Sequence, residues 1–405
     1  MSTTIAVLGT LDTKGTEHAY IADLIRARGH AVILIDAGTG GDPQVRPDIT
    51  REQLAAAGGI DLAAILAAND RGQAVTAMAD AAAALLANLA DQGAIHGVIS
   101  LGGGGGTAIG TSAMRALPIG FPKLMVSTLA AGNTAPYVGT KDIVMMPSVV
   151  DIAGLNRISR LLLARAAGAI CGMVETAVPE EPGDSRPLIA ASMFGNTTDC
   201  VDAARQALER DGYEVLVFHA TGSGGRTMES LIESGLIRGA LDVTTTEWAD
   251  ELCGGVLSAG PTRLEAAGHA GIPAVVAPGC LDMVNFGEPD SVPDRFRDRL
   301  FYRHNPQVTL MRSNAGECAQ LGRILAAKVN AYKGPVTVLL PLRGVSVISA
   351  EGGPFHDPEA DLALFDAIRT NLDPQVGIEE LDCTINDPAF AAACVRRLIA
   401  HLGET

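Results

Sequence analysis

Basic residues are scarce in this sequence. Its 405 residues include 30 Lys and Arg against 46 Asp and Glu, which gives a formal net charge of -16 and an isoelectric point near 4.9. Because nucleic-acid binding depends on clustered cations that neutralise phosphates, this balance argues against nucleic acid as a partner. The 47% share of hydrophobic residues is typical of a globular protein, and the length suffices for two cores.

The sequence also lacks paired cysteines and long apolar runs. Its seven cysteines are scattered singly, without a CxxC pair, which fits neither a zinc ribbon nor a disulfide framework. The N-terminus lacks both the basic region and the long apolar region of a secretory signal peptide. The most apolar stretches, 81–90 and 161–173, are shorter than a membrane span. We therefore expect a cytoplasmic protein with no membrane partner and no dedicated metal site.

Two halves of the chain follow the same plan. The segment 175–187 is rich in Pro, Gly and charge, which predicts one domain over 1–180 and a second over 188–405. Each half opens with an apolar strand, a Gly/Thr turn and an amphipathic helix that ends at glycine. Further on, residues 96–110 resemble 254–268, and 121–128 resemble 272–279. These parallels indicate an internal duplication of a βαβ-type unit.

The expected strands are unbroken apolar runs. This pattern indicates burial on both faces and hence parallel sheets covered by helices, so we predict an α/β protein with two Rossmann-like domains. Ligands of such sheets bind beyond the carboxyl ends of the strands. We therefore expect the loops of the two domains to line a cleft between them. A further helix is predicted to begin at Pro147–Ser148 and to continue through Leu162.

A run of five glycines is the first candidate binding site. It follows the apolar strand 98–101 and opens a helix, so its backbone N–H groups and the helix N-terminus favour a phosphate. The alternative is a flexible turn that lets helix and strand pack closely. The run is neither a Walker loop nor a GxGxxG fingerprint. The candidate phosphate-binding residues of this loop are Gly102, Gly103, Gly104, Gly105, Gly106 and Thr107.

The turn after the first strand is the second candidate. Asp12 and Thr13 are also plausible caps of the helix that follows. Lys14 favours a ligand, because a cation at a helix N-terminus is unfavourable unless an anion lies nearby. The candidate residues of this loop are Gly9, Thr10, Asp12, Thr13 and Lys14.

Three residues of the second half are candidates for catalysis on a second substrate. His219 ends a strand and begins a small-residue loop, where a titratable group is well placed for chemistry. Asp282 can orient water or a substrate hydroxyl, or it can satisfy loop backbone groups. Arg343 lies in a loop of small residues, where its guanidinium suits a carboxylate or a phosphate.

Several segments together resemble a known family. In chain order, the resemblance is carried by GTLDTKG, LGGGGGT, YVGTKDIVMMPSVVDIAGLNRISR, GNTT, FHATGSGGRTME, TTTEWADELCGGVLSAGPTRLEAAG, PGCLDMVNFG, HNPQVTLMR, PLRGVS and GPFHDPEAD. These segments are similar to a bacterial and plant family of uncharacterised proteins, typified by the ATP-binding N-terminal domain of the tomato mosaic virus resistance protein. The resemblance covers nearly the whole chain and implies two Rossmann-like subdomains, ATP binding and pairing into dimers.

Three functions are compatible with these features. The first is an ATP-binding protein, either an enzyme or an enzyme component, that acts on a small anionic substrate and receives Mg²⁺ with its nucleotide. The second is a homodimer that senses a nucleotide or binds a partner without turnover. The third is an ATP-independent hydrolase or lyase of the sugar-acid type. Titratable side chains in the loops of the second half favour chemistry over binding alone.

Overall fold

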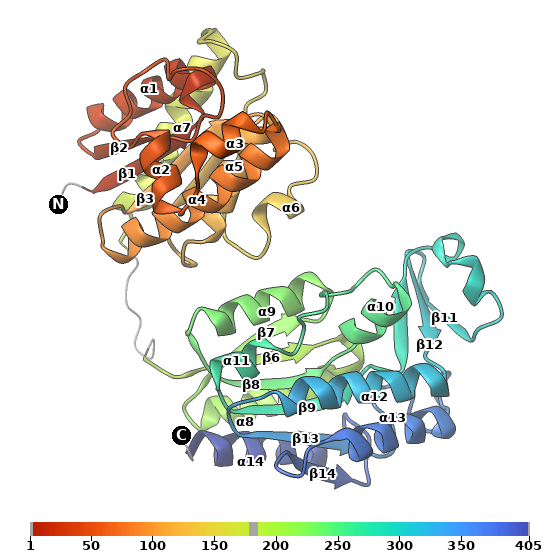
Figure 1. Ribbon diagram of the computed structural model, residues 1–405. Coiled ribbons are helices and arrows are strands. Elements are labelled where there is room, and N and C mark those ends of the chain that lie inside the picture. Colours follow the sequence, from red (N-terminus) through yellow and green to blue (C-terminus); the bar gives the residue numbers. More distant parts are fainter. Residues whose placement is uncertain (1–2, 178–184, 404–405) are drawn as a thin grey trace. The chain divides into compact units, whose positions relative to one another are not determined.

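A computed structural model of the protein describes residues 3–177 and 185–403 (Figure 1). The chain divides into two compact units, unit 1 over residues 1–180 and unit 2 over 181–405. Most of the expected linker between the two domains lies outside the described residues. Each unit is a parallel α/β domain, as the apolar runs predicted.

Unit 1 has a five-stranded parallel sheet in the order β2-β1-β3-β4-β5. Its strands are β1 (Thr4–Gly9), β2 (Ala31–Asp36), β3 (Gly97–Gly102), β4 (Lys123–Ser127) and β5 (Val144–Pro147). Its helices are α1 (Leu11–Ala27), α2 (Arg51–Ala57), α3 (Leu62–Ala67), α4 (Arg71–Asp91), α5 (Gly104–Arg115), α6 (Ala135–Val138) and α7 (Arg157–Glu175). The chain order reverses between β1 and β3, so a crevice is expected at their carboxyl ends.

Helices cover both faces of this sheet. One core layer contains Leu54 of α2, Met78 of α4 and Ile109 of α5. The opposite layer contains Ile21 of α1 and Leu163 of α7. Strands β3 and β4 are buried along their whole length between these layers. This explains why their sequences show continuous rather than alternating hydrophobicity.

Helix α4 is the one described helix that is long and apolar enough to cross a membrane. The apolar stretch 81–90 is therefore only part of a longer helix. Met78, Ala82 and Leu86 are fully buried in the core of unit 1. Through these residues one face of α4 packs on the core of unit 1, and 33% of its apolar segment is buried.

Helix α7 begins later than the sequence pattern predicted. The segment between β5 and α7 is not helical, and Val149 within it has a φ of 62°. The helix begins at Arg157, where the Asn156 side chain accepts hydrogen bonds from the N–H groups of Ile158 and Ser159, both at 2.9 Å. The prediction of a helix from Pro147 was wrong, because apolar spacing does not register the backbone turn at Val149.

Unit 2 contains a six-stranded parallel sheet in the order β14-β13-β9-β8-β6-β7 and a small antiparallel sheet in the order β10-β12-β11. Its strands are β6 (Leu188–Met193), β7 (Glu214–His219), β8 (Ile237–Thr244), β9 (Ala274–Gly279), β10 (Met283–Phe286), β11 (Phe301–Asn305), β12 (Val308–Arg312), β13 (Val336–Pro341) and β14 (Gly377–Leu381). Its α-helices are α8 (Thr198–Arg210), α9 (Ser223–Glu233), α10 (Glu247–Cys253), α11 (Ala266–Ala270), α12 (Ala315–Asn330), α13 (Pro358–Asn371) and α14 (Pro388–Gly403). Short 3-10 helices cover Gly195–Thr197, Pro289–Ser291 and Asp294–Phe296.

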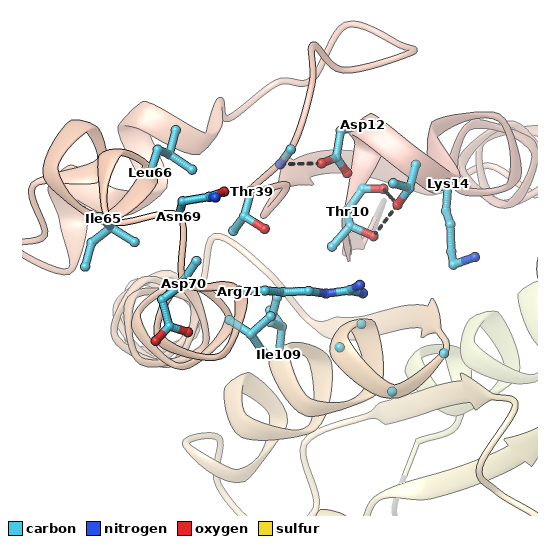
Figure 2. Close-up of a pocket in the computed structure, with 18 residues that line it drawn as sticks. Thr10, Asp12, Lys14, Thr39, Ile65, Leu66, Asn69, Asp70, Arg71 and Ile109 are labelled. Atoms are coloured by element: carbon cyan, nitrogen blue, oxygen red, sulfur yellow. Dashed lines mark hydrogen bonds between the residues drawn. The ribbon is translucent and has the colours of Figure 1, made fainter.

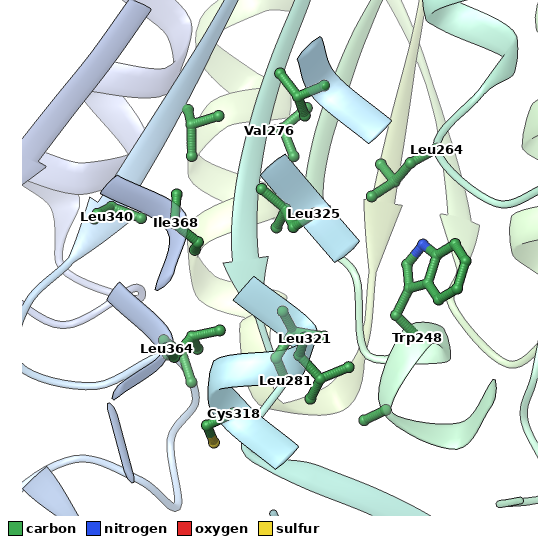
Figure 3. Close-up of a cluster of buried hydrophobic side chains, with 14 of the residues drawn as sticks. Trp248, Leu264, Val276, Leu281, Cys318, Leu321, Leu325, Leu340, Leu364 and Ile368 are labelled. Carbon is green, nitrogen blue, oxygen red and sulfur yellow. The ribbon is translucent and has the colours of Figure 1, made fainter. Parts of the chain in front are cut away.

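The larger core layer of unit 2 lies between its parallel sheet and helices α12 and α13 (Figure 3). Leu321 and Leu325 of α12 and Leu364 of α13 are buried there, against Val276 of β9. Beside this layer, the fully buried Arg263 contacts three carboxylates. Since an unpaired buried cation is very costly, this cluster stabilises the surrounding loops only as a complete set.

The two parallel sheets share one strand order, which supports the duplication. Counted from its first strand, each sheet runs 2-1-3-4-5, and unit 2 adds a sixth strand. The pairing of 121–128 with 272–279 agrees with this order, because β4 corresponds to β9. The pairing of 96–110 with 254–268 was wrong, because β3 corresponds to β8 instead. Residues 254–265 form turns and no strand, despite their similar composition.

Candidate functional site

A cavity of about 510 Å³ lies in unit 1 where β1 and β3 end (Figure 2). This is the point at which the strand order reverses, the usual ligand position in open parallel sheets. The cavity is lined by Thr10, Asp12, Thr13, Lys14, Thr39, Gly40, Ile65, Leu66, Asn69, Asp70, Arg71, Ala74, Val75, Gly103, Gly104, Gly105, Gly106 and Ile109. Both loops predicted from the sequence therefore border one cavity.

The glycine run forms the first turn of α5. Gly103 is the residue before the helix, and no side chain caps the helix N-terminus. The first N–H groups of a helix have no intrahelical acceptor, so those of Gly104 to Gly106 are available to a ligand. The helix dipole adds partial positive charge at the same place. This end of the cavity therefore favours a bound anion.

The ends of the glycine run support the loop instead of lining the cavity. An ideal Cβ on Gly102 would lie 2.7 Å from Cα of Gly106, so this position requires glycine for close packing. The Thr107 hydroxyl is buried and lies 2.7 Å from the Ser127 hydroxyl of β4. The alternative interpretation, a turn that lets helix and strand pack closely, thus applies to Gly102 and Thr107. The four residues from Gly103 to Gly106 border the cavity.

The loop after β1 contributes hydroxyl, carboxylate and ammonium groups. Asp12 accepts a hydrogen bond from the N–H of Gly40 through Oδ2 at 2.7 Å. Its buried Oδ1 has no hydrogen-bond partner within residues 3–177 and 185–403. The ammonium of Lys14 donates to the backbone carbonyl of Ile152, which ties the cavity wall to the segment before α7. Lys14 is therefore already engaged, although it borders the cavity.

Gly9 has a structural position beneath this loop. An ideal Cβ on Gly9 would lie 1.7 Å from Nε2 of His18, so no other residue fits without a shift. His18 is fully buried, and its Nδ1 lies 2.7 Å from the carbonyl oxygen of Lys14. Burial lowers the pKa of His18 to about 4, so its imidazole is neutral near neutral pH. Gly9 and His18 together fix the start of α1.

Arg71 is a cavity residue that the sequence interpretation missed. It begins α4, and Figure 2 shows its side chain extended across the cavity. Its Nη2 lies 4.0 Å from the ideal Cβ position of Gly105. Among the described residues, no hydrogen bond or ion pair engages its guanidinium. The sequence feature that could have placed Arg71 at a helix start is Asp70, directly before it. The Asp70 side chain caps α4 by accepting a hydrogen bond from the N–H of Gln73 at 3.0 Å.

The wall formed by α3 and α4 is different in character. It presents Ile65, Leu66 and Val75, together with Ile109 of α5. Asn69 is the polar residue at this end, and Figure 2 places it between Ile65 and Thr39. The cavity thus combines an anion-binding end with an apolar wall, which suits an amphipathic ligand with an anionic group.

The three catalytic candidates of unit 2 are not gathered into one site. His219 is exposed at the end of the edge strand β7, where its ring lies 5.4 Å from that of Phe194. Arg343 follows β13 and makes an exposed ion pair with Asp382 at 2.6 Å. Four strand spacings separate β7 from β13, which is roughly 19 Å. His219 and Arg343 therefore do not face a common small substrate.

Asp282 is fully buried after β9. Its Oδ2 accepts a hydrogen bond from the Ser346 hydroxyl at 2.8 Å, whereas its Oδ1 has no hydrogen-bond partner in the described part of the chain. Burial raises the pKa of Asp282 to about 6, and the nearby Arg312 opposes this shift. In this structure the carboxylate supports a loop and is not open to solvent.

The fold and site define a two-domain parallel α/β protein with a cavity at the strand-order reversal of its first domain. Models of an uncharacterised protein family match both halves of the chain, the N-terminal domain over residues 3–179 and the C-terminal domain over 186–402. The chain belongs to this family, UPF0261.

Relatives in bacteria and plants show how far this likeness extends. A UPF0261 protein of Clostridium tetani is 50% identical over 98% of this chain and 99% of its own length. The ToMV resistance protein Tm-1 of Solanum lycopersicum is 43% identical over 81% of this chain and 44% of its own length. Among solved structures, a UDP-N-acetylglucosamine 2-epimerase from Rickettsia bellii aligns with 68% of this chain and 78% of its own length, at 11% identity and a TM-score of 0.24.

Proposed function

We propose that unit 1 binds ATP in the cavity at the ends of β1 and β3. One observation carries the proposal: the uncapped N-terminus of α5 and the guanidinium of Arg71, which has no partner among the described residues, border the same cavity. Backbone amides at a helix N-terminus and a guanidinium are groups that commonly bind phosphate oxygens in proteins. In a chain of net charge -16, such a concentration of donors at one place favours an anionic ligand.

The other cavity residues suit the remaining parts of ATP. The apolar wall of Ile65, Leu66 and Val75 offers a surface for the base, and the cavity has the size of common ligand pockets. Asp12 borders the same cavity, and carboxylates are protein ligands that Mg²⁺ takes, so we assign to Asp12 the contact with the Mg²⁺ that accompanies the nucleotide. The proposal assigns no chemistry to unit 2, because His219 and Arg343 lie far apart.

A substitution at Gly104 tests the proposal. No heavy atom lies within 4 Å of an ideal Cβ on Gly104, so Gly104→Val leaves the fold intact and fills space at the phosphate end. We expect ATP with Mg²⁺ at a hundredfold its Kd to raise the unfolding free energy of the wild type by about 2.7 kcal/mol. The variant should show no such gain. The measurement is the melting temperature as a function of ATP concentration.

Gly172→Val is the matched control. Gly172 lies in α7, away from the cavity lining, and its ideal Cβ also has no neighbour within 4 Å. This control should respond to ATP as the wild type does. Absence of any nucleotide response in the wild type, or an unchanged response in Gly104→Val, would contradict the proposal. Analysis of ATP after long incubation then separates an enzyme from a nucleotide-sensing protein.

A further inference from the structure

Asn69 occupies a left-handed turn position at the edge of the cavity. It lies between α3 and α4 with a φ of 51°, in the left-handed region that glycine and, among other residues, chiefly asparagine adopt. The next residue, Asp70, caps α4 through its side chain. The turn between the two helices therefore fixes the backbone position of Asn69 at the edge of the cavity.

The carboxamide of Asn69 is free to bind a ligand. Figure 2 shows the side chain at the cavity edge beside Ile65 and Leu66. Within the described residues no hydrogen bond engages its amide or its carbonyl oxygen. Asp70 is not equivalent, because one of its carboxylate oxygens accepts from the N–H of Gln73. Asn69 thus places one donor and one acceptor side by side at the apolar end of the cavity.

We propose that Asn69 determines the base specificity of the cavity by recognising adenine. This inference rests on the proposed function, because it assigns the base to the apolar wall and the phosphates to α5. The Asn69 carbonyl oxygen accepts a hydrogen bond from the N6 amine of adenine, and its amide donates to ring nitrogen N7. Guanine presents two acceptors, O6 and N7, along the same edge. The Asn69 carbonyl oxygen then faces another acceptor, which disfavours guanine.

Asn69→Gly removes the carboxamide without a backbone penalty. Glycine adopts a positive φ readily, so the turn and the cap of α4 should persist. We expect the affinity for ATP with Mg²⁺ to fall about tenfold, and the affinity for GTP to stay within about twofold of the wild type. Calorimetric titration of the full chain with each nucleotide measures this loss of selectivity.

An ATP analogue in which a C–H group replaces N7 tests the contact itself. The wild type should bind this analogue about tenfold more weakly than ATP, because the Asn69 amide loses its acceptor. Asn69→Gly should bind the analogue and ATP equally. Val149→Gly is the matched control, since it also places glycine at a positive φ, at a residue that does not line the cavity. It should retain the selectivity of the wild type.

The outcomes separate this inference from the function on which it rests. If the wild type binds no nucleotide, the proposed function fails. If Gly104→Val abolishes ATP binding while Asn69→Gly keeps the wild-type preference for ATP over GTP, the cavity binds ATP and the role of Asn69 is overturned. Equal binding of ATP and the analogue by the wild type would also overturn it.

Discussion

Val149 adopts a backbone conformation that β-branched residues avoid. Its φ is 62°, and its side chain is 76% exposed, so little packing compensates for the conformation. The residue lies in the segment before α7 whose Ile152 carbonyl accepts from Lys14. Strain at this residue is therefore located next to the cavity wall.

Glycine at position 149 should stabilise the protein. Val149→Gly removes the steric conflict and loses almost no buried surface, so we expect the unfolding free energy of unit 1 to rise by about 1 kcal/mol. Hydrogen exchange of unit 1 peptides in the full chain, at increasing urea concentration, measures this unfolding free energy. Val256 is a comparable valine, 64% exposed, that is not among the residues with positive φ. Val256→Gly should lower stability, and a loss in Val149→Gly as well would disprove the argument.

At the scale of elements, the strand-to-helix loops were predictable and the far wall of the cavity was not. An apolar run followed by a glycine-rich turn indicates a parallel strand, and neighbouring carboxyl ends bring such turns together. That reasoning placed Thr10 and Gly104 at one cavity. Arg71 and Asn69 reach it through the connection after α3, a helix of only six residues. Such a short connection carries little periodic signal, and tertiary packing decides where it lies.

The start of α1 makes unit 1 sensitive to acid. His18 is held neutral in the folded state, with a pKa of about 4 against 6.5 for an exposed histidine. The unfolded chain therefore binds more protons between these values, so stability is fully present above pH 6.5 and is lost as the pH falls toward 4. Asp36 gives the stability of unit 1 a pH dependence of the opposite sign, because burial raises the pKa of its carboxyl group.

Substitution of His18 isolates its contribution to the pH dependence of stability. Between pH 7 and pH 5 we expect His18 to cost unit 1 about 2 kcal/mol of stability. In His18→Asn this part of the pH dependence should disappear, while the contribution of Asp36 stays in both proteins. Urea unfolding followed by hydrogen exchange at the two pH values gives the comparison. An equal pH dependence in both proteins would show that His18 is not the group responsible.

At the scale of the whole molecule, the fold is duplicated but the site is not. Strand β8, which corresponds to β3, ends at Thr244 and is followed by Thr245 and Thr246, and all three are fully buried. The equivalent strand end of unit 2 is therefore closed by buried threonine side chains, whereas unit 1 has open amides there. The expected cleft between the two domains and the homodimer stay predictions.

Hydrogen exchange with and without ATP and Mg²⁺ reports on the same backbone amides that are proposed to bind phosphate. We expect slower exchange in the segments 10–14 and 103–107 when ATP is present, and no such change in Gly104→Val. Unchanged exchange in both segments, with slowing confined to other parts of the chain, would contradict the proposed phosphate binding.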